Sequence, residues 1–269
     1  MNNGDLDPLY KNRPVTLWVE DALTRDYLTA AWDVPSKIQL LVAGSSSGVS
    51  TLANSARKSG YKSVYGLCDR DFGATNYSTW SKGTPVFRLQ MHEIENALLD
   101  PSALHSALVV LGRQRSEADI RKRLIQEASA ACWGMALGST FAWMRRTLCR
   151  DFPESPDLMN VSDRRAAVAH ILHSAWWKTH RPAFPVTFTT AAVRQELRRA
   201  YAAYQRDLGS NAFLTTFAGK ELLGRCLSWL VQKGPVPHPT DSDLAMAVGN
   251  AQRATGTVPP EVSTLKNLL

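Results

Sequence analysis

Short apolar segments rich in β-branched and aromatic residues alternate with helical segments in the first part of the chain, and this alternation restricts the fold more than any other feature. The expected strands are 15–19, 38–42, 63–68 and 85–89, and helices are expected over 21–32 and about 49–59. Strands that alternate with helices are joined by crossover connections, which make neighbouring strands parallel. The sequence therefore predicts an α/β fold with a mostly parallel sheet flanked by helices.

After Pro101 the sequence predicts helices and no further strand. Helices are expected over 116–150, 162–178, 190–208, 219–232 and 241–254. Gly134 and Gly138 are candidate break points in the first of these. Proline-rich segments at 151–156 and 234–239 predict a helix breaker and a rigid linker. The sequence therefore predicts a mainly helical C-terminal region.

Charge is distributed unevenly between these two parts. Residues 1–111 contain 10 Lys and Arg against 11 Asp and Glu, whereas residues 112–269 contain 21 against 13. We therefore predict two domains, one over 1–111 that contains the strands and an arginine-rich helical one over 112–269. A basic lobe suits a polyanionic partner such as nucleic acid, because Lys and Arg neutralise phosphates. The alternative is that arginines simply occupy the solvated faces of helices.

The remaining composition indicates a cytoplasmic protein. Hydrophobic residues make up 44% of the chain and charged residues 20%, which is typical of a globular protein. The four cysteines form no C-x-x-C pair, so we expect reduced thiols. We expect no membrane association, because no segment approaches the roughly 20 apolar residues of a membrane span and the first residues do not resemble a signal peptide.

Acidic residues follow three of the predicted strands. Glu20 ends the first strand, Asp69 and Asp71 follow the third, and Glu93 and Glu95 follow the fourth. Because the carboxyl ends of parallel strands share one edge of the sheet, where such folds bind ligands, we expect these acids to converge. If the third strand continues, Asp69 and Asp71 point to the same face.

Converging carboxylates repel one another unless a cation neutralises them. Oxygen ligands favour Mg²⁺, with Mn²⁺ as a substitute. Two such ions roughly 4 Å apart can activate a water and stabilise the leaving oxygen of a phosphodiester. Glu20 is then either a further metal ligand or the general base. The ordinary explanation of the same acids is helix capping, turn formation and ion pairing at helix starts.

Taken together, these motifs resemble a TOPRIM domain, the fold shared by topoisomerases, bacterial primases and OLD-family nucleases. The resemblance rests on Val15-Thr16-Leu17-Trp18-Val19-Glu20-Asp21, the turn at Gly44, Asp69-Arg70-Asp71-Phe72 and His92-Glu93-Ile94-Glu95-Asn96. The last two of these motifs are most similar in sequence to those of a bacterial TOPRIM family that accompanies ABC-type ATPases. The best-known branch of this family is the AriB effector subunits of PARIS anti-phage systems. The motifs cover about residues 15–100.

This resemblance implies roles for individual residues. Glu20 matches the strand-end glutamate, Asp69 and Asp71 the metal-binding pair, and Glu95 the acid before the asparagine, with Glu93 a less certain counterpart. In that family a Gly-Lys pair opens a later helix, and Gly219-Lys220 matches it. The resemblance implies a Mg²⁺-dependent nuclease that cuts DNA or RNA, with tRNA as one candidate. It also implies a toxic anti-phage effector restrained by an ABC-type ATPase partner, and a homodimer is one possible assembly.

Several alternatives remain open at the level of the sequence. The acidic edge could be inactive, and the chain could be a non-catalytic binding subunit of an ATPase complex. A primase-like activity would need a further domain, and the short Ala43-Gly44 turn departs from many TOPRIM proteins, which weakens that interpretation. The 44–48 loop lacks the lysine and spacing of a nucleotide-binding P-loop. Lys220 could contact the scissile phosphate or lie on a solvated helix face.

Overall fold

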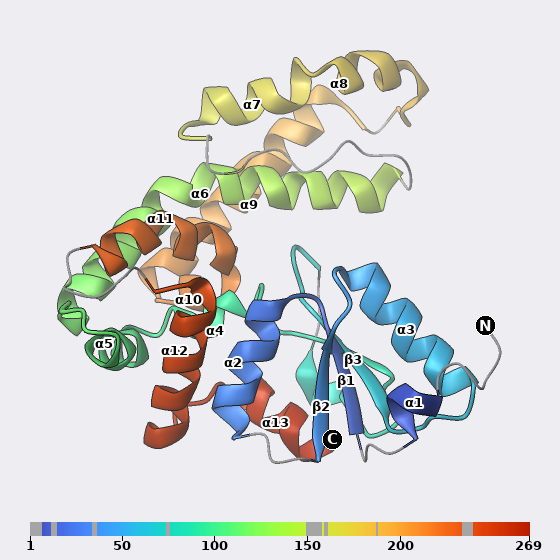
Figure 1. Ribbon diagram of the computed structural model, residues 1–269. Coiled ribbons are helices and arrows are strands. Elements are labelled where there is room, and N and C mark those ends of the chain that lie inside the picture. Colours follow the sequence, from blue (N-terminus) through green and yellow to red (C-terminus); the bar gives the residue numbers. More distant parts are fainter. Residues whose placement is uncertain are drawn as a thin grey trace.

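A parallel sheet at one end of the molecule carries the predicted acids, and helices form the rest (Figure 1). The computed structural model describes residues 7–11, 15–33, 37–73, 76–148, 158, 161–186, 188–232 and 239–269. Within them the strands are β1 (Val15–Val19), β2 (Ile38–Val42), β3 (Val64–Cys68) and β4 (Val86–Arg88). All pair in parallel, in the order β2-β1-β3-β4. The predicted α/β fold with a parallel sheet is thereby confirmed.

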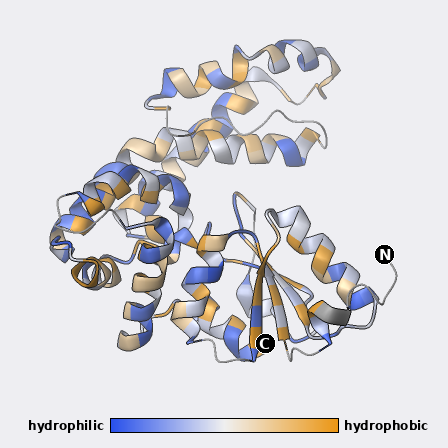
Figure 2. Ribbon diagram, in the orientation of Figure 1, coloured by the Kyte–Doolittle hydropathy of each residue, from blue (hydrophilic) through white to orange (hydrophobic). Residues whose placement is uncertain are grey.

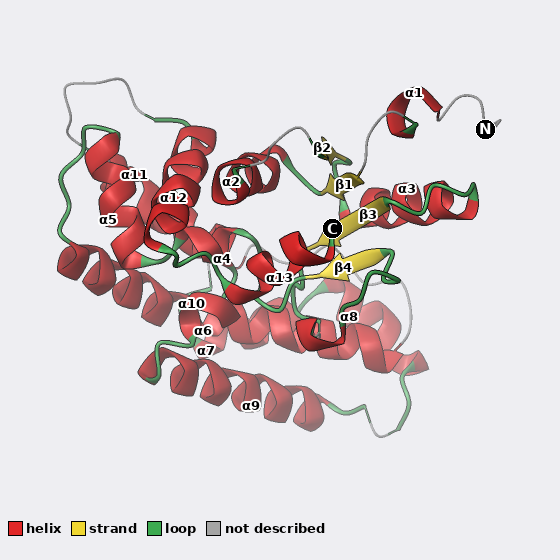
Figure 3. Cartoon of the chain, turned by 90° about the horizontal axis from the view of Figure 1, so that it is seen from below, coloured by secondary structure: helices red, strands yellow, loops and turns green. Residues whose placement is uncertain are grey.

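Alternate residues of the central strands enter two different cores, one on each face of the sheet. Leu17 and Val19 of β1 belong to the larger core together with Tyr27 of α2 (Ala22–Trp32). Trp18, between them, belongs to a smaller core with Val49 of α3 (Ser46–Lys58). Because side chains alternate along a strand, α2 and α3 cover opposite faces (Figure 3). Figure 2 shows the hydrophobic residues that these two-sided strands carry.

The two helices that flank the sheet begin at side-chain caps. Asp21 accepts a hydrogen bond from the Thr24 N–H at 2.8 Å and so fixes the start of α2. Ser45 accepts one from the Gly48 N–H at 3.1 Å, and α3 therefore starts at Ser46 rather than at the predicted position near 49. A capping serine satisfies an N–H that has no partner within the helix, and this moves the start toward the N-terminus.

In the described residues after Pro101 every regular element is helical, as predicted. The helices of this region are α5 (Pro101–Val110), α6 (Glu117–Leu148), α7 (Arg164–Leu172), α8 (Ala175–His180), the short 3-10 helix η4 (Arg181–Ala183), α9 (Thr190–Gly209), α10 (Phe213–Thr216), α11 (Gly219–Val231), α12 (Asp241–Thr255) and α13 (Pro260–Leu268). The earlier part also contains α1 (Asp7–Tyr10), η2 (Tyr77–Thr79) and α4 (Glu95–Leu98). Helices α1, α4, α5, α10 and α13 and the 3-10 helices η2 and η4 are additional to those predicted. None of the described helices has an apolar stretch of the length that crossing a lipid bilayer requires.

Two details of the helical region differ from the prediction. Helix α6 runs unbroken through Gly134 and Gly138. A Cβ at Gly134 would lie 2.3 Å from the Leu158 carbonyl oxygen, and one at Gly138 would lie 2.3 Å from the Phe72 ring. These glycines therefore permit close packing and do not interrupt the helix. The predicted 162–178 helix is two helices, because Ser174 caps a new start at α8.

The breaker at 151–156 and all of the 234–239 segment except Pro239 lie outside the described residues. Of the four cysteines, Cys68, Cys132 and Cys226 are buried free thiols.

The change of charge after Leu111 does not coincide with a gap in packing. One continuous core contains residues from both sides, among them Leu28, Leu104, Leu222 and Leu265. Helix α12 packs along α2 so closely that a Cβ at Gly249 would lie 2.8 Å from the Tyr27 carbonyl oxygen. Helices from the second part of the sequence therefore complete the core around the sheet.

Candidate metal-binding and catalytic site

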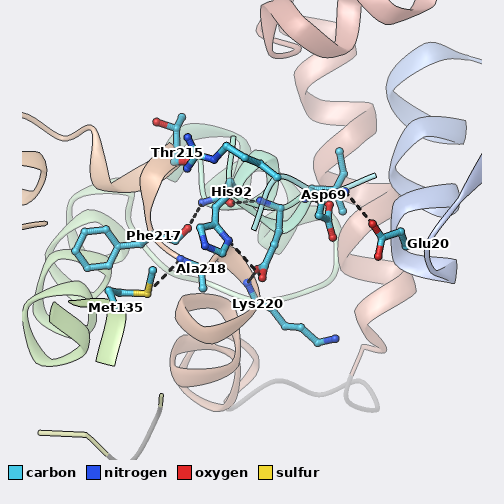
Figure 4. Close-up of polar contacts among 12 residues, drawn as sticks. Glu20, Asp69, His92, Met135, Thr215, Phe217, Ala218 and Lys220 are labelled. Atoms are coloured by element: carbon cyan, nitrogen blue, oxygen red, sulfur yellow. Dashed lines mark hydrogen bonds and ion pairs between the residues drawn. The ribbon is translucent and has the colours of Figure 1, made fainter. Parts of the chain in front are cut away.

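The first two predicted acids lie side by side at the carboxyl edge of the sheet (Figure 4). Glu20 follows β1 and Asp69 follows β3, and these strands are hydrogen-bonded neighbours. The backbone N–H of Asp69 donates to Glu20 Oε1 at 2.9 Å. The Gly44 N–H donates to the Glu20 carbonyl oxygen at 2.9 Å, and Gly44 has a φ of 85°, a left-handed conformation that glycine adopts without strain. The turn after β2 thus also fixes the backbone of Glu20.

Asp69 is held from two further directions. Its Oδ1 accepts a hydrogen bond from the Ile94 N–H at 3.2 Å, and its carbonyl oxygen accepts one from Arg88 Nη1 at 2.8 Å. Burial raises the pKa of Asp69 to about 9, and the negative charges of Glu95 and Glu20 act in the same direction. Burial also raises the pKa of Glu20, with the charge of Asp71 adding to it against the opposing Asp69 N–H. Negative charge at this edge is therefore poorly compensated by the protein.

The two glutamates after β4 have different surroundings. Burial, followed by the charge of Glu93, raises the pKa of Glu95 to about 7. Burial also acts to raise the pKa of Glu93, but contact with His92 and the Lys220 N–H outweighs it and the pKa is lowered. His92 Nδ1 lies 3.4 Å from Glu93 Oε1, and the Lys220 N–H donates to Glu93 Oε2 at 2.7 Å. Both carboxylate oxygens of Glu93 therefore already have partners within the protein.

Lys220 reaches this edge because α11 starts directly against α4. A Cβ at Gly219 would lie 2.5 Å from the Asn96 backbone nitrogen, so only glycine allows this approach without displacement. The exposed Lys220 lines a pocket of about 500 Å³ together with Glu95 and Asp21. The Gly-Lys pair singled out in the sequence therefore has a structural explanation: the glycine permits the contact, and the lysine brings a positive charge to the acids.

Asp71 is oriented differently from the expectation of a continuing strand. Strand β3 ends at Cys68, and Asp71 has a φ of 51° in a turn. The N–H groups of Arg70 and Asp71 both donate to the His92 carbonyl oxygen at 3.0 Å. The exposed Asp71 lines a separate pocket of about 240 Å³ with Phe72 of the same turn and Tyr204 of α9. The premise that Asp69 and Asp71 share a strand face is therefore wrong, because the chain turns immediately after Asp69.

Asn96 organises the site, although the sequence analysis gave it no role beyond its place in the motif. Its side chain is 5% exposed, and its Oδ1 accepts the Glu93 N–H at 2.8 Å. Its Nδ2 donates to the carbonyl oxygens of Leu214 and Phe217, both at 2.9 Å. It therefore joins the acidic segment to the chain that leads into α11. The position of an asparagine after Glu-Ile-Glu was the only available signal, and such a signal does not reveal its distant partners.

The carboxylates of Glu20 and Asp69 fit a hard divalent cation that takes most of its other ligands from water. Asp69 has a single side-chain hydrogen bond and no ion pair among the described residues. Within the described parts of the chain, no three His, Cys, Asp or Glu side chains form a ready-made cluster for an ion. Mg²⁺ is typically held by one or two carboxylates, with waters and substrate phosphates as its other ligands. Glu20 and Asp69 could supply such a pair.

Comparisons with known proteins add no assignment. No protein-family model matches the chain. No curated protein matches it significantly in sequence.

The raised pKa of Asp69 predicts an unusual dependence of stability on pH. Between about pH 4 and the folded pKa of about 9, the folded chain retains a proton that the unfolded chain has released. The free energy of unfolding should therefore fall as the pH rises through this range. In buffer with EDTA we expect a lower melting temperature at about pH 8 than at about pH 5.

Mg²⁺ should reverse this loss, because a cation binds the ionised carboxylates of the folded state. Its stabilising effect should be larger at about pH 8 than at about pH 5. Calorimetry with KCl of equal ionic strength as the control measures both effects. An Asp69→Asn variant should have a weaker pH dependence. A melting temperature that rises with pH in EDTA would contradict the prediction.

Proposed function

We propose that the protein is a Mg²⁺-dependent nuclease that hydrolyses phosphodiester bonds in DNA or RNA. The observation that carries the proposal is the contact between Glu20 and Asp69 at the ends of adjacent parallel strands. Glu95 and Lys220 line a pocket at the same edge, which provides room for a substrate beside these carboxylates. The carboxyl edge of a parallel sheet is the usual ligand site of such folds.

Each residue has a distinct role in this proposal. Glu20 and Asp69 would hold the ion, with Mn²⁺ as a substitute for Mg²⁺. A bound divalent ion would neutralise phosphate charge and favour ionisation of the attacking water. Glu95 and Lys220 line the pocket. Glu95 would accept a proton from that water, and Lys220 would contact a phosphate oxygen. Glu93 orients the start of α11 through the Lys220 N–H, and Asp71 acts on Glu20 through its charge.

The biological setting of the proposal comes from the resemblance to the TOPRIM family of anti-phage effectors. On that basis we propose an ABC-type ATPase partner that restrains the nuclease, and a cytoplasmic location. A homodimer and a structured RNA such as tRNA belong to the same proposal. Co-purification of the tagged chain with its neighbouring gene products would test the ATPase partner.

The direct test is cleavage by the purified full chain. Matched panels of single-stranded DNA, duplex DNA and structured RNA are incubated with Mg²⁺, with Mn²⁺, or with EDTA. We expect products from at least one panel with either metal and none with EDTA. Isothermal titration with Mg²⁺ in the absence of nucleic acid distinguishes the alternative: neither cleavage nor metal binding would support a non-catalytic binding subunit of an ATPase complex.

A further inference from the structure

Residues of α7 and α9 line a basic groove. Helix α7 lies away from the sheet that carries the acidic edge (Figure 1). The volume of the groove is about 620 Å³. Arg164 and Arg165 come from the first turn of α7, and Arg194 from the first part of α9. His173 follows α7, and Val168 and Ala169 provide an apolar surface; the groove lining contains no acidic residue. Among the described residues, the groove is therefore lined by three positively charged arginines and no carboxylate.

Within the described part of the chain, the three groove arginines have no carboxylate partner, unlike several other arginines of the protein. Among the described residues Arg164, Arg165 and Arg194 make no ion pair and no side-chain hydrogen bond, and all three are exposed. By contrast, Arg199 on the same helix α9 pairs with Glu196 at 2.6 Å. Arginines of α6 pair with glutamates in the same way, as Arg123 does with Glu127 at 2.8 Å.

The nearest acid in the sequence makes no ion pair with the groove arginines among the described residues. Asp163 is the N-cap of α7, and its Oδ1 accepts the Ala166 N–H at 2.9 Å. It is therefore committed to the start of the helix. Three guanidinium groups without an internal counter-charge suit a partner with several closely spaced anionic groups. Guanidinium groups bind phosphates with two parallel hydrogen bonds, which favours phosphate over a diffuse negative surface.

We infer that the α7–α9 groove binds the phosphodiester backbone of a nucleic acid. This inference rests on the proposed function, since it places the substrate class of that function on a surface away from the acids. Binding there would release condensed counterions in proportion to the number of phosphates neutralised. The groove should therefore contribute affinity and salt dependence, with little preference for base sequence.

The test uses the full chain with Glu20→Gln, which measures binding without requiring hydrolysis. Arg164→Gln, Arg165→Gln and Arg194→Gln are combined in this background. A matched triple variant replaces Lys122, Arg181 and Arg206, which are exposed, make no ion pair among the described residues and lie outside the groove lining. Affinity for a short DNA duplex and for an RNA hairpin is measured by fluorescence anisotropy over a series of salt concentrations.

We expect the groove variant to lose affinity by at least about tenfold at low salt, and the slope of log affinity against log salt to become shallower by about 2 to 3 for the duplex. The matched variant should change both quantities much less. An unchanged slope in the groove variant, or an equal loss in both triple variants, overturns the inference.

The inference and the proposed function can fail separately. If the chain with Glu20 cleaves nucleic acid while the groove variant binds like its parent, the groove assignment is wrong and the nuclease proposal stands. If the groove variant loses affinity as expected but no Mg²⁺-dependent cleavage is found, the groove is supported as a nucleic-acid site and hydrolysis is rejected.

Discussion

Replacing Glu20 with Gln, or Asp69 with Asn, is expected to lower the cleavage rate by roughly 10³-fold, because a divalent ion in such a site supplies several kcal/mol of transition-state stabilisation. Both changes remove a charge and keep the shape. In Glu20→Gln the new amide oxygen can still accept the Asp69 N–H, and in Asp69→Asn it can still accept the Ile94 N–H. The measurement is single-turnover cleavage of the best substrate at saturating Mg²⁺.

These variants should also be at least as stable as the parent chain in EDTA. Burial and the neighbouring acids disfavour ionisation of both carboxyl groups in the fold, so the amide removes the free-energy cost of holding a proton or a charge there. Higher melting temperatures combined with lost cleavage would separate catalysis from folding. Asp33→Asn is the matched control, because Asp33 is exposed, lies at the other end of α2 and has a left-handed φ of 51° that asparagine tolerates. Full EDTA-sensitive cleavage by both variants would refute the assigned site.

Replacing Asn96 with Ala is expected to destabilise the fold by about 3 kcal/mol, because buried polar groups left without partners cost about 1–3 kcal/mol each. The change removes hydrogen bonds to the carbonyl oxygens of Leu214 and Phe217, and leaves the Glu93 N–H without its acceptor. Chemical denaturation monitored by tryptophan fluorescence measures the loss. Cleavage should fall as well, because Asn96 sets the position of α11 and Lys220 relative to Glu93.

Asn54→Ala is the matched control for this prediction. Asn54 donates one hydrogen bond to the Ser50 carbonyl oxygen on the exposed side of α3, at 2.8 Å. Its loss should cost well under about 1 kcal/mol, since water replaces an exposed partner. Equal effects of the two substitutions would show that the buried links of Asn96 do not organise the site.

The strands and the acids that follow them were predictable because both depend on local sequence. Apolar β-branched runs define β1 and β3 to within a residue, and the shared carboxyl edge of parallel strands places Glu20 and Asp69 together. The turn at Asp71 was not predictable, because its left-handed backbone depends on two hydrogen bonds to His92, a residue far along the chain. The roles of Gly134 and Gly138 were missed for the same reason, since a glycine in a helix reveals its purpose only through what packs against it.

The packing of the helices around the sheet could not be predicted from the sequence either. Charge predicted a boundary after Leu111, whereas packing depends on contacts such as the Tyr27 hydroxyl donating to Gln252 at 2.6 Å. Gln252 donates in turn to the Ala97 carbonyl oxygen of α4 at 2.7 Å. Single buried glutamines of this kind carry no periodic pattern in the sequence. Only the folded chain shows that α2, α4 and α12 meet.

The contact between helix α13 and the loop after β4 has a consequence for the order in which the chain completes its fold. The Glu261 carboxylate accepts the backbone N–H groups of Gln90 and Met91, immediately before the acidic segment. A ribosome synthesises Glu261 long after it has made that loop, so the loop has no such support while the intervening residues are being added. The loop before the acidic segment would therefore lack these two hydrogen bonds until α13 has emerged from the exit tunnel. In the proposed nuclease, this order of events would keep unfinished chains inactive.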